Sequence, residues 1–176
     1  MIFTCNIASQ VTMIDCNSTN TIIDSCLFQE GSATGLTCID INGGGANECD
    51  GVKVINCEFK APTAGNYNAA IELGEVADRA VVDNCTVFGD FDDACIHNPT
   101  GKVLTNLTIS NCTLTNLLTG QHAVELVSAC TGVEKYLLFY TDTYATTNDP
   151  GALACFECYS VSSVDKNARL NPVVES

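Results

Sequence analysis

The chain has 176 residues, of which 46% are apolar and only 16% are charged, a composition typical of a folded domain rather than a disordered one. Acidic side chains number 21 against 7 basic ones, and the net charge of −14 excludes a basic, nucleic-acid-binding surface. No apolar run approaches the roughly 18 residues of a membrane-spanning helix, and residues 1–10 show no secretory signal. Thr, Asn, Val and Ile are abundant, which favours an all-β protein.

A short phrase recurs along the chain: an apolar residue, Cys three positions later, and another apolar residue two positions after that. In chain order it occurs at 2–7, 23–28, 54–59, 82–87 and 109–114, and its cysteines are 21, 31, 28 and 27 residues apart. A period in this range predicts a solenoid of stacked repeats.

A second phrase alternates with the first and places an acidic residue or His between two mostly apolar ones. Its copies lie at 14–16, 39–41, 71–73, 96–98, 124–126 and 156–158. Apolar positions two apart indicate a strand with one buried face. We therefore expect an outward column formed by Asp15, Asp40, Glu72, His97, Glu125 and Glu157. The inward columns would be Ile14, Ile39, Ile71, Ile96, Val124, Phe156 and Ile23, Val54, Val82, Ile109.

Three asparagines precede the repeated cysteines, at Asn56, Asn84 and Asn111. The apolar positions around them are three apart, which a straight strand cannot send to one side, so the backbone must bend there. Asn tolerates the left-handed conformation that such a bend requires, and stacked Asn amides can bond along the axis. The cysteines that follow would form one stacked column of Cys26, Cys57, Cys85 and Cys112.

A further column directly precedes the inward residues of the second phrase. It consists of small or apolar side chains: Met13, Cys38, Ala70, Cys95, Ala123 and Cys155. Strict alternation would point them outward beside the carboxylates, where they would form a subunit contact. The alternative is a bend that turns them inward.

The twelve cysteines leave three redox states open. The cysteines could be reduced thiols packed as small apolar side chains, or several of them could form disulfides. The third alternative is a metal site at the single CxxC of Cys155–Cys158. The length of the chain and the position of the cysteines in strand-like runs favour packed thiols.

The Asn-Cys phrases and the stretch Asp92–Leu117 resemble the right-handed parallel β-helix family with the pectin-lyase-like fold. The resemblance covers roughly residues 2–160 and implies an all-β, right-handed parallel β-helix of about six short coils at 1–160. Residues 161–176 would form a non-repetitive C-terminal tail or docking arm. The first repeat begins at Ile2 without a preceding amphipathic helix, so we expect another chain, or a further part of this one, to cover the first coil.

Two functions are open, because this architecture carries enzymes and structural proteins alike. The first is a non-enzymatic structural or attachment protein: an oligomeric, trimeric knob or decoration protein of tailspike type on a phage or viral particle. It would be made in the cytoplasm, need no cofactor, and contact its own copies, other particle proteins and a glycan, but neither nucleic acid nor membrane.

The second function is an extracellular polysaccharide-binding or polysaccharide-degrading module. The resemblance implies that outward acidic residues act as acid and base or hold calcium, which would make Asp92, Asp93, His97 and Glu72 the catalytic candidates. However, the Gly-His-Gly and Arg-x-Lys signatures of the family's enzymes are absent.

Overall fold

A computed structural model describes residues 1–4, 12–29, 35–42, 49–61, 67–74, 77–99, 101–128, 130–141, 147–148, 152–156, 159–162 and 171–172. All regular elements in these ranges are β-strands, which confirms the all-β prediction. No helix with the length and apolar character needed to cross a bilayer occurs in the part of the chain that the structure describes.

The strands form three large sheets and one small one. Sheet A has the order β1 (Ile2–Thr4), β4 (Leu27–Gln29), β7 (Glu58–Lys60), β11 (Thr86–Gly89), β15 (Thr113–Asn116), β18 (Leu138–Thr141), β21 (Tyr159–Ser162), β22 (Asn171–Pro172). Sheet B has the order β2 (Thr12–Cys16), β5 (Thr37–Ile41), β8 (Tyr67–Glu72), β12 (Phe91–Asn98), β16 (His122–Leu126), β19 (Thr147–Asn148). Sheet C has the order β3 (Ile22–Asp24), β6 (Lys53–Ile55), β10 (Val81–Asp83), β14 (Leu107–Ser110), β17 (Thr131–Lys135), β20 (Ala152–Phe156). The small sheet pairs β9 (Ala77–Asp78) with β13 (Leu104–Thr105).

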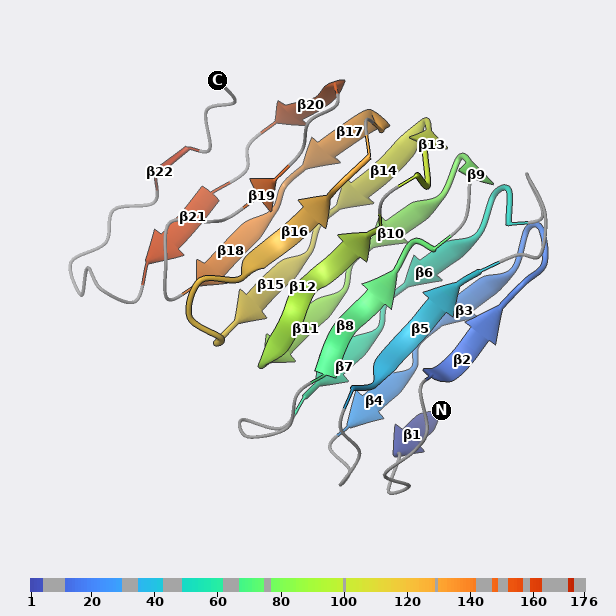
Figure 1. Cartoon of the computed structure of the whole chain (residues 1–176), viewed down its shortest axis with the longest axis horizontal. Helices are drawn as coiled ribbons and strands as arrows, with labels where there is room; N and C mark the ends of the chain where they lie inside the picture. Colours follow the sequence, from blue (N-terminus) through green and yellow to red (C-terminus); the bar gives the residue numbers. More distant parts are fainter. Residues whose placement is uncertain are drawn as a thin grey trace.

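The chain visits sheets B, C and A in succession and then climbs to the next level, so strands of successive turns lie side by side (Figure 1). Neighbouring strands within each sheet are parallel, except that β22 pairs antiparallel with β21. This is the stacked, repetitive β-solenoid that the two phrases predict.

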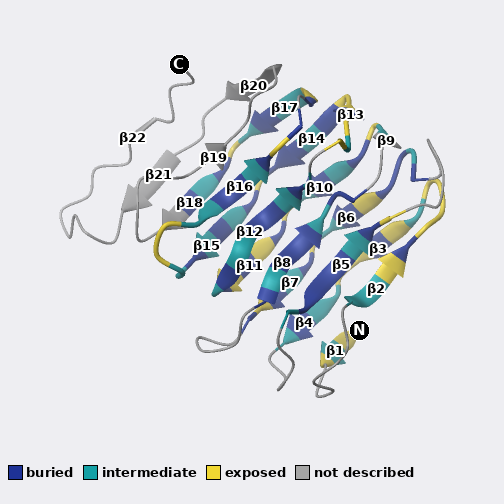
Figure 2. Ribbon diagram, in the orientation of Figure 1, coloured by how far each residue is buried: buried dark blue, intermediate teal, exposed yellow. Residues whose placement is uncertain are grey.

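The solenoid has about four turns, fewer than the six coils predicted. Four consecutive turns, from β5 to β18, enclose a buried interior, whereas exposed residues gather on β1, β2 and β3 at the N-terminal end (Figure 2). The phrase count overestimated the number because it included the incompletely covered first turn and a sixth copy that the structure places elsewhere.

Aliphatic and aromatic side chains lie above one another in the interior. The predicted column Ile23, Val54, Val82 and Ile109 is in register across sheet C, and all four side chains are buried. Burying each such side chain contributes about 1.5–3 kcal/mol before entropy is subtracted. In sheet A, Phe28 stacks between Phe3 and Phe59, with ring centroids 5.0 and 4.8 Å apart.

The sixth copy of the second phrase does not lie in the sheet that the sequence pattern predicts for it. Phe156 does not continue the column of Val124, because β20 joins sheet C, where Cys155 pairs with Glu134 and Phe156 with Lys135. The strand beside β16 is β19, which puts Asn148 opposite Glu125. The predicted outward residue Glu157 lies outside the described residues. The spacing concealed this, because the step of 32 residues from Val124 to Phe156 equals the step from Ile39 to Ile71.

The predicted Asn bend is present between sheets C and A. Asn56, Asn84 and Asn111 have φ of 54°, 51° and 54°, which is the left-handed region. The amide ladder is mixed rather than purely Asn-to-Asn. Asn84 Nδ2 donates to Asn56 Oδ1 at 2.7 Å, but Asn56 donates to Asp24 at 2.9 Å and Asn111 to Asp83 at 2.8 Å.

A second left-handed corner, between sheets B and C, was not predicted. Its residues are Asn20, Gly51, Arg79 and Asn106, with φ between 54° and 69°. The backbone N–H of each of the first three donates to a carbonyl of the next turn. Because the four residue types differ and include an Arg, no repeated residue type marks this corner in the sequence.

Candidate functional site

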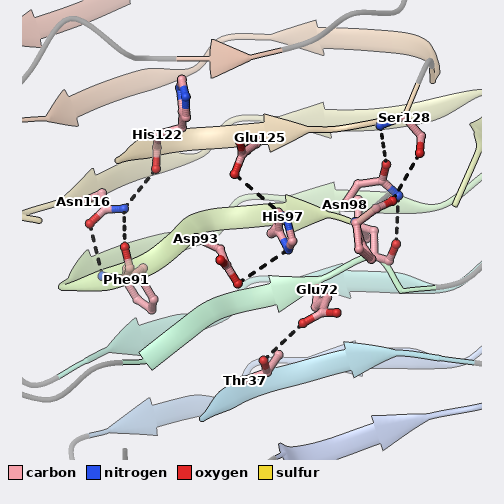
Figure 3. A network of polar contacts seen from close by, with 12 residues as sticks. Thr37, Glu72, Phe91, Asp93, His97, Asn98, Asn116, His122, Glu125 and Ser128 are labelled. Carbon is pink, nitrogen blue, oxygen red and sulfur yellow. Dashed lines mark hydrogen bonds and ion pairs between the residues drawn. The ribbon is translucent and has the colours of Figure 1, made fainter. Parts of the chain in front are cut away.

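The outward acidic column exists on five neighbouring strands of sheet B, from β2 to β16. Backbone register pairs Asp15 with Asp40, Asp40 with Glu72, Glu72 with His97, and His97 with Glu125. Asp15 is exposed and the other four are half-buried. Glu72, His97 and Glu125 therefore come from three adjacent strands (Figure 3).

The small residues beside this column face the core, which corrects the expectation of an outward contact surface. Cys38, Ala70, Cys95 and Ala123 are at most 2% exposed and belong to the connected hydrophobic core, while Met13 on the first turn is half-buried. Cys155 is on sheet C, as described above.

The physical reason can be followed in β5, where the alternation of side chains is interrupted. Thr37 Oγ1 donates a hydrogen bond to Glu72 Oε2 at 3.4 Å, so both side chains lie on the outer face. Strict alternation would put Thr37 and Asp40 on opposite faces, yet Asp40 is in register with Glu72. Two consecutive residues, Cys38 and Ile39, therefore point inward, which is the bend that formed the alternative interpretation.

Asp40 is the carboxyl group most strongly influenced by this environment. Burial, and then the negative charges of Glu72 and Asp15, raise the pKa of Asp40 to about 6. Gly74 makes room for it, because a Cβ at that position would lie 2.8 Å from Asp40 Oδ1. Asn42 Nδ2 donates to the other oxygen at 3.5 Å.

His97 is held between two carboxylates. Its Nδ1 lies 3.9 Å from Asp93 Oδ2 and its Nε2 lies 4.0 Å from Glu125 Oε2. The His97 side chain is 13% exposed, whereas Asp93 is 43% and Glu125 23% exposed. A register shift between Phe91 and Ala94 inserts one extra residue in β12 and places Asp93 on this side (Figure 3).

The structure thus brings three of the four catalytic candidates together: Glu72, Asp93 and His97. Asp92 is half-buried within the same bulge. His122 is not part of this group: it pairs in register with Ala94, one turn away. Within the described residues, no three His, Cys, Asp or Glu side chains are arranged to hold a metal ion.

Two buried asparagines fix both ends of β12, and sequence reasoning missed them. Asn116 Nδ2 donates to the carbonyls of Phe91 and His122, each at 3.0 Å, and its Oδ1 accepts the N–H of Phe91 at 3.2 Å. Asn98 Nδ2 donates to the carbonyls of Leu73 at 2.9 Å and Lys102 at 2.6 Å. Satisfying these backbone groups keeps the strand that carries Asp93 and His97 in place. The signal was available, since Asn98 replaces the apolar third member of the second phrase.

Comparisons with family models, with curated proteins and with solved structures gave no match to this chain.

Proposed function

We propose that this chain is a non-enzymatic structural or attachment module of the tailspike or decoration-protein kind, and that the acidic column is its contact surface. The observation that supports this proposal most directly is the even spacing of the column, with one ionisable side chain per strand from Asp15 to Glu125. At about 4.8 Å between neighbouring strands, the four steps from Asp15 to Glu125 span roughly 19 Å. Such an array suits repeated weak contacts along an extended partner, a glycan or a particle protein. Catalysis instead needs groups that converge on one bond.

We also propose that the solenoid is right-handed, as in the pectin-lyase-like fold. Crossovers between parallel strands of one sheet are right-handed in almost all known proteins, because twisted strands pack back onto the sheet only in that sense. The proposed location is the surface of a virion or a similar particle.

Self-association into a trimer is supported by the outer face of sheet C. One of the two register-matched columns on that face has a single charge and consists of Ile22, Lys53, Val81, Thr108 and Val133, whereas the other consists of Asp24, Ile55, Asp83, Ser110 and Lys135. Ile22 is 59% exposed, and Val81 and Val133 are half-buried. A ring of three that buries this column keeps the acidic columns of sheet B apart, which reduces repulsion between copies with a charge of −14 each.

Light scattering tests the association. We expect about 56 kDa, three times the chain mass of 18.6 kDa. Val81→Lys should shift the mass to that of one chain, because it puts a second cation into the buried column. Thr86→Lys, an exposed position on sheet A, is the matched control and should leave the trimer intact. A monomeric parent protein would contradict the trimer.

A polysaccharide hydrolase or lyase is the second candidate, favoured by the neighbourhood of Asp93, His97 and Glu72 and by the raised pKa of Asp40. Release of reducing or unsaturated sugars from neutral and acidic polysaccharides, with calcium and with a chelator, tests it. The structural proposal predicts no product. Product that disappears in Asp93→Asn, but not in Glu58→Gln on sheet A, would establish the enzyme instead.

A further inference from the structure

Four cysteine thiols form a column at the corner between sheets C and A. Each Sγ donates to the carbonyl two residues before it, which shows that all four side chains adopt the same orientation. The contacts are Cys26 to Asp24 at 3.3 Å, Cys57 to Ile55 at 3.2 Å, Cys85 to Asp83 at 3.4 Å and Cys112 to Ser110 at 3.0 Å. All four are free thiols.

Cys26 and Cys57 are direct neighbours in this column. The bonds from Ser25 N to the Ile55 carbonyl at 3.1 Å and from Glu58 N to the Cys26 carbonyl at 2.9 Å bracket the two residues. Cys57 Sγ lies 3.6 Å from the carbonyl oxygen of Ile23, in the strand that leads to Cys26. Parallel strands are about 4.8 Å apart, inside the roughly 4.4–6.8 Å over which disulfides join Cα atoms.

Accessibility distinguishes Cys26 from the rest of the column. Cys57, Cys85 and Cys112 are at most 2% exposed, whereas Cys26 on the first turn is half-buried. Below it lies Met1, whose carbonyl accepts the N–H of Leu27 and which is itself 79% exposed. A dissolved reagent therefore reaches the column at Cys26.

We propose that Cys26 and Cys57 are a redox-sensitive pair, in which Cys26 reacts with a small disulfide and Cys57 resolves the adduct to form a disulfide between the first two turns. This role goes beyond the acidic column and does not depend on it.

The chemistry is a thiol–disulfide exchange in two steps, with oxidised glutathione as the co-reactant. The Cys26 thiolate attacks one sulfur of the reagent, which forms a mixed disulfide and releases one glutathione thiolate. Cys85, and then burial, raise the pKa of the Cys57 thiol above its usual value. Cys57 therefore gives its proton to the departing second glutathione sulfur as it attacks the Cys26 sulfur, and the second glutathione leaves as the thiol. Two electrons pass from the protein dithiol to the reagent, which becomes two reduced glutathiones.

The rate should rise steeply with pH. Burial, and then the neighbouring Cys57, raise the pKa of the Cys26 thiol above its usual value of 9.0. Because only the thiolate attacks, the initial rate should increase about tenfold for each pH unit between 7 and 9. The resulting disulfide would tie the edge of the stack to the second turn and slow hydrogen exchange in β4 by about tenfold or more.

The pair can be read directly from a tryptic map of the full chain. Cleavage after Lys53 and Lys60 leaves Cys57 as the single cysteine of fragment 54–60, while Cys26 lies in fragment 1–53. The reduced protein is incubated with oxidised glutathione at pH 8, alkylated and digested without reduction. We expect fragments 1–53 and 54–60 to become linked, and fragmentation to assign the bond to Cys26.

Variants identify the two roles. Cys57→Ser should stop the reaction at a glutathione adduct on Cys26, with Cys57→Ala as the replacement where the serine variant does not fold. Cys26→Ser should abolish the link, and Cys112→Ser at the far end of the column is the matched control that should retain it. Absence of the link after prolonged incubation would overturn the proposal, as would its persistence in Cys26→Ser.

Discussion

At the scale of single residues, the corners of the solenoid depend on side chains that accept a left-handed backbone. Asn56 does so at φ 54°, and its side chain also connects Asp24 below to Asn84 above. The residue therefore contributes through its backbone conformation and through two hydrogen bonds, and a pair of substitutions separates the two contributions.

Asn56→Gly should remove both side-chain bonds while keeping the backbone relaxed, whereas Asn56→Ala should remove the bonds and strain the backbone. We expect the alanine variant to be less stable than the glycine variant by about 1 kcal/mol. Urea unfolding of both variants measures the difference. Equal stabilities would mean that the left-handed corner carries no strain for alanine.

Asp40 makes stability depend on pH in a direction opposite to that of most carboxylates. Its pKa is raised from 3.8 to about 6, so the folded chain binds a proton that the unfolded chain has released at intermediate pH. Stability therefore falls as pH rises from about 4 to about 6.

Asp40→Asn should remove this dependence. We expect the variant to be more stable than the parent at pH 7 and nearly equal to it at pH 4, measured by thermal unfolding across this range. Glu58→Gln, which also removes one negative charge but lies on sheet A, is the control and should keep the parent's pH profile. An unchanged profile in Asp40→Asn would mean that Asp40 is not the group responsible.

At the corner between sheets C and A, the sequence predicted the left-handed backbone conformation but only part of the side-chain hydrogen bonds. The spacing around Asn84 required a bend, and Asn is one of few residues that form it readily. However, the ladder continues through Asp24 and Asp83, and no repeated letter marks these positions. The hydrogen-bond partners depend on the side chains of the turns above and below, which one local phrase does not contain.

At the scale of strands, close packing between turns leaves no room for side chains at certain positions. Gly132 in β17 has φ 151°, and a Cβ there would overlap the backbone carbonyl of Leu107 in β14. By contrast, a Cβ on Gly120, at φ 88°, meets no atom within 4 Å.

Gly132→Ala should therefore destabilise the chain by about 3 kcal/mol or more, since the backbone of β14 or β17 must move. Gly120→Ala should cost only about 1 kcal/mol, from backbone strain alone. Chemical denaturation of both variants, followed by hydrogen exchange in β14 and β17, provides the comparison. Similar losses in the two variants would contradict the close approach.

The strands of sheet B show why alternation alone gave the wrong face for the small residues. Cys38 and Ile39 are consecutive and both inward, whereas a straight strand alternates. Alternating apolar and polar residues do not mark the position at which the alternation is interrupted. Alternation does not predict the burial of Glu134 either. This charged residue is 2% exposed and lies in register with the buried Ile109.

At the scale of the whole molecule, the net charge of −14 opposes folding and association through repulsion. Raising NaCl from about 20 mM to about 200 mM should screen this repulsion and raise the melting temperature by about 2–5 °C. Scanning calorimetry at several salt concentrations measures the effect. A melting temperature that falls with salt would indicate that attractive ion pairs dominate instead.

The parallel stacking and most of the acidic column were predictable because both depend on a repeated period. The number of turns and the neighbour of β16 were not, because residues between strands vary in number and can place a similar phrase in another sheet. Phe156 illustrates this: its phrase matches that of Val124, yet its strand pairs with β17.

The two left-handed corners have a consequence for how such a chain can change. Asn20 and Ser25, Gly51 and Asn56, Arg79 and Asn84, and Asn106 and Asn111 are each separated by five positions. The segment between the two corners has the same length in each of these turns, whereas the spans that lead into it differ in length from turn to turn. An insertion or deletion in one of those spans would leave the alignment of the corners between turns undisturbed, so the surface there can change while the stacked strands stay in register.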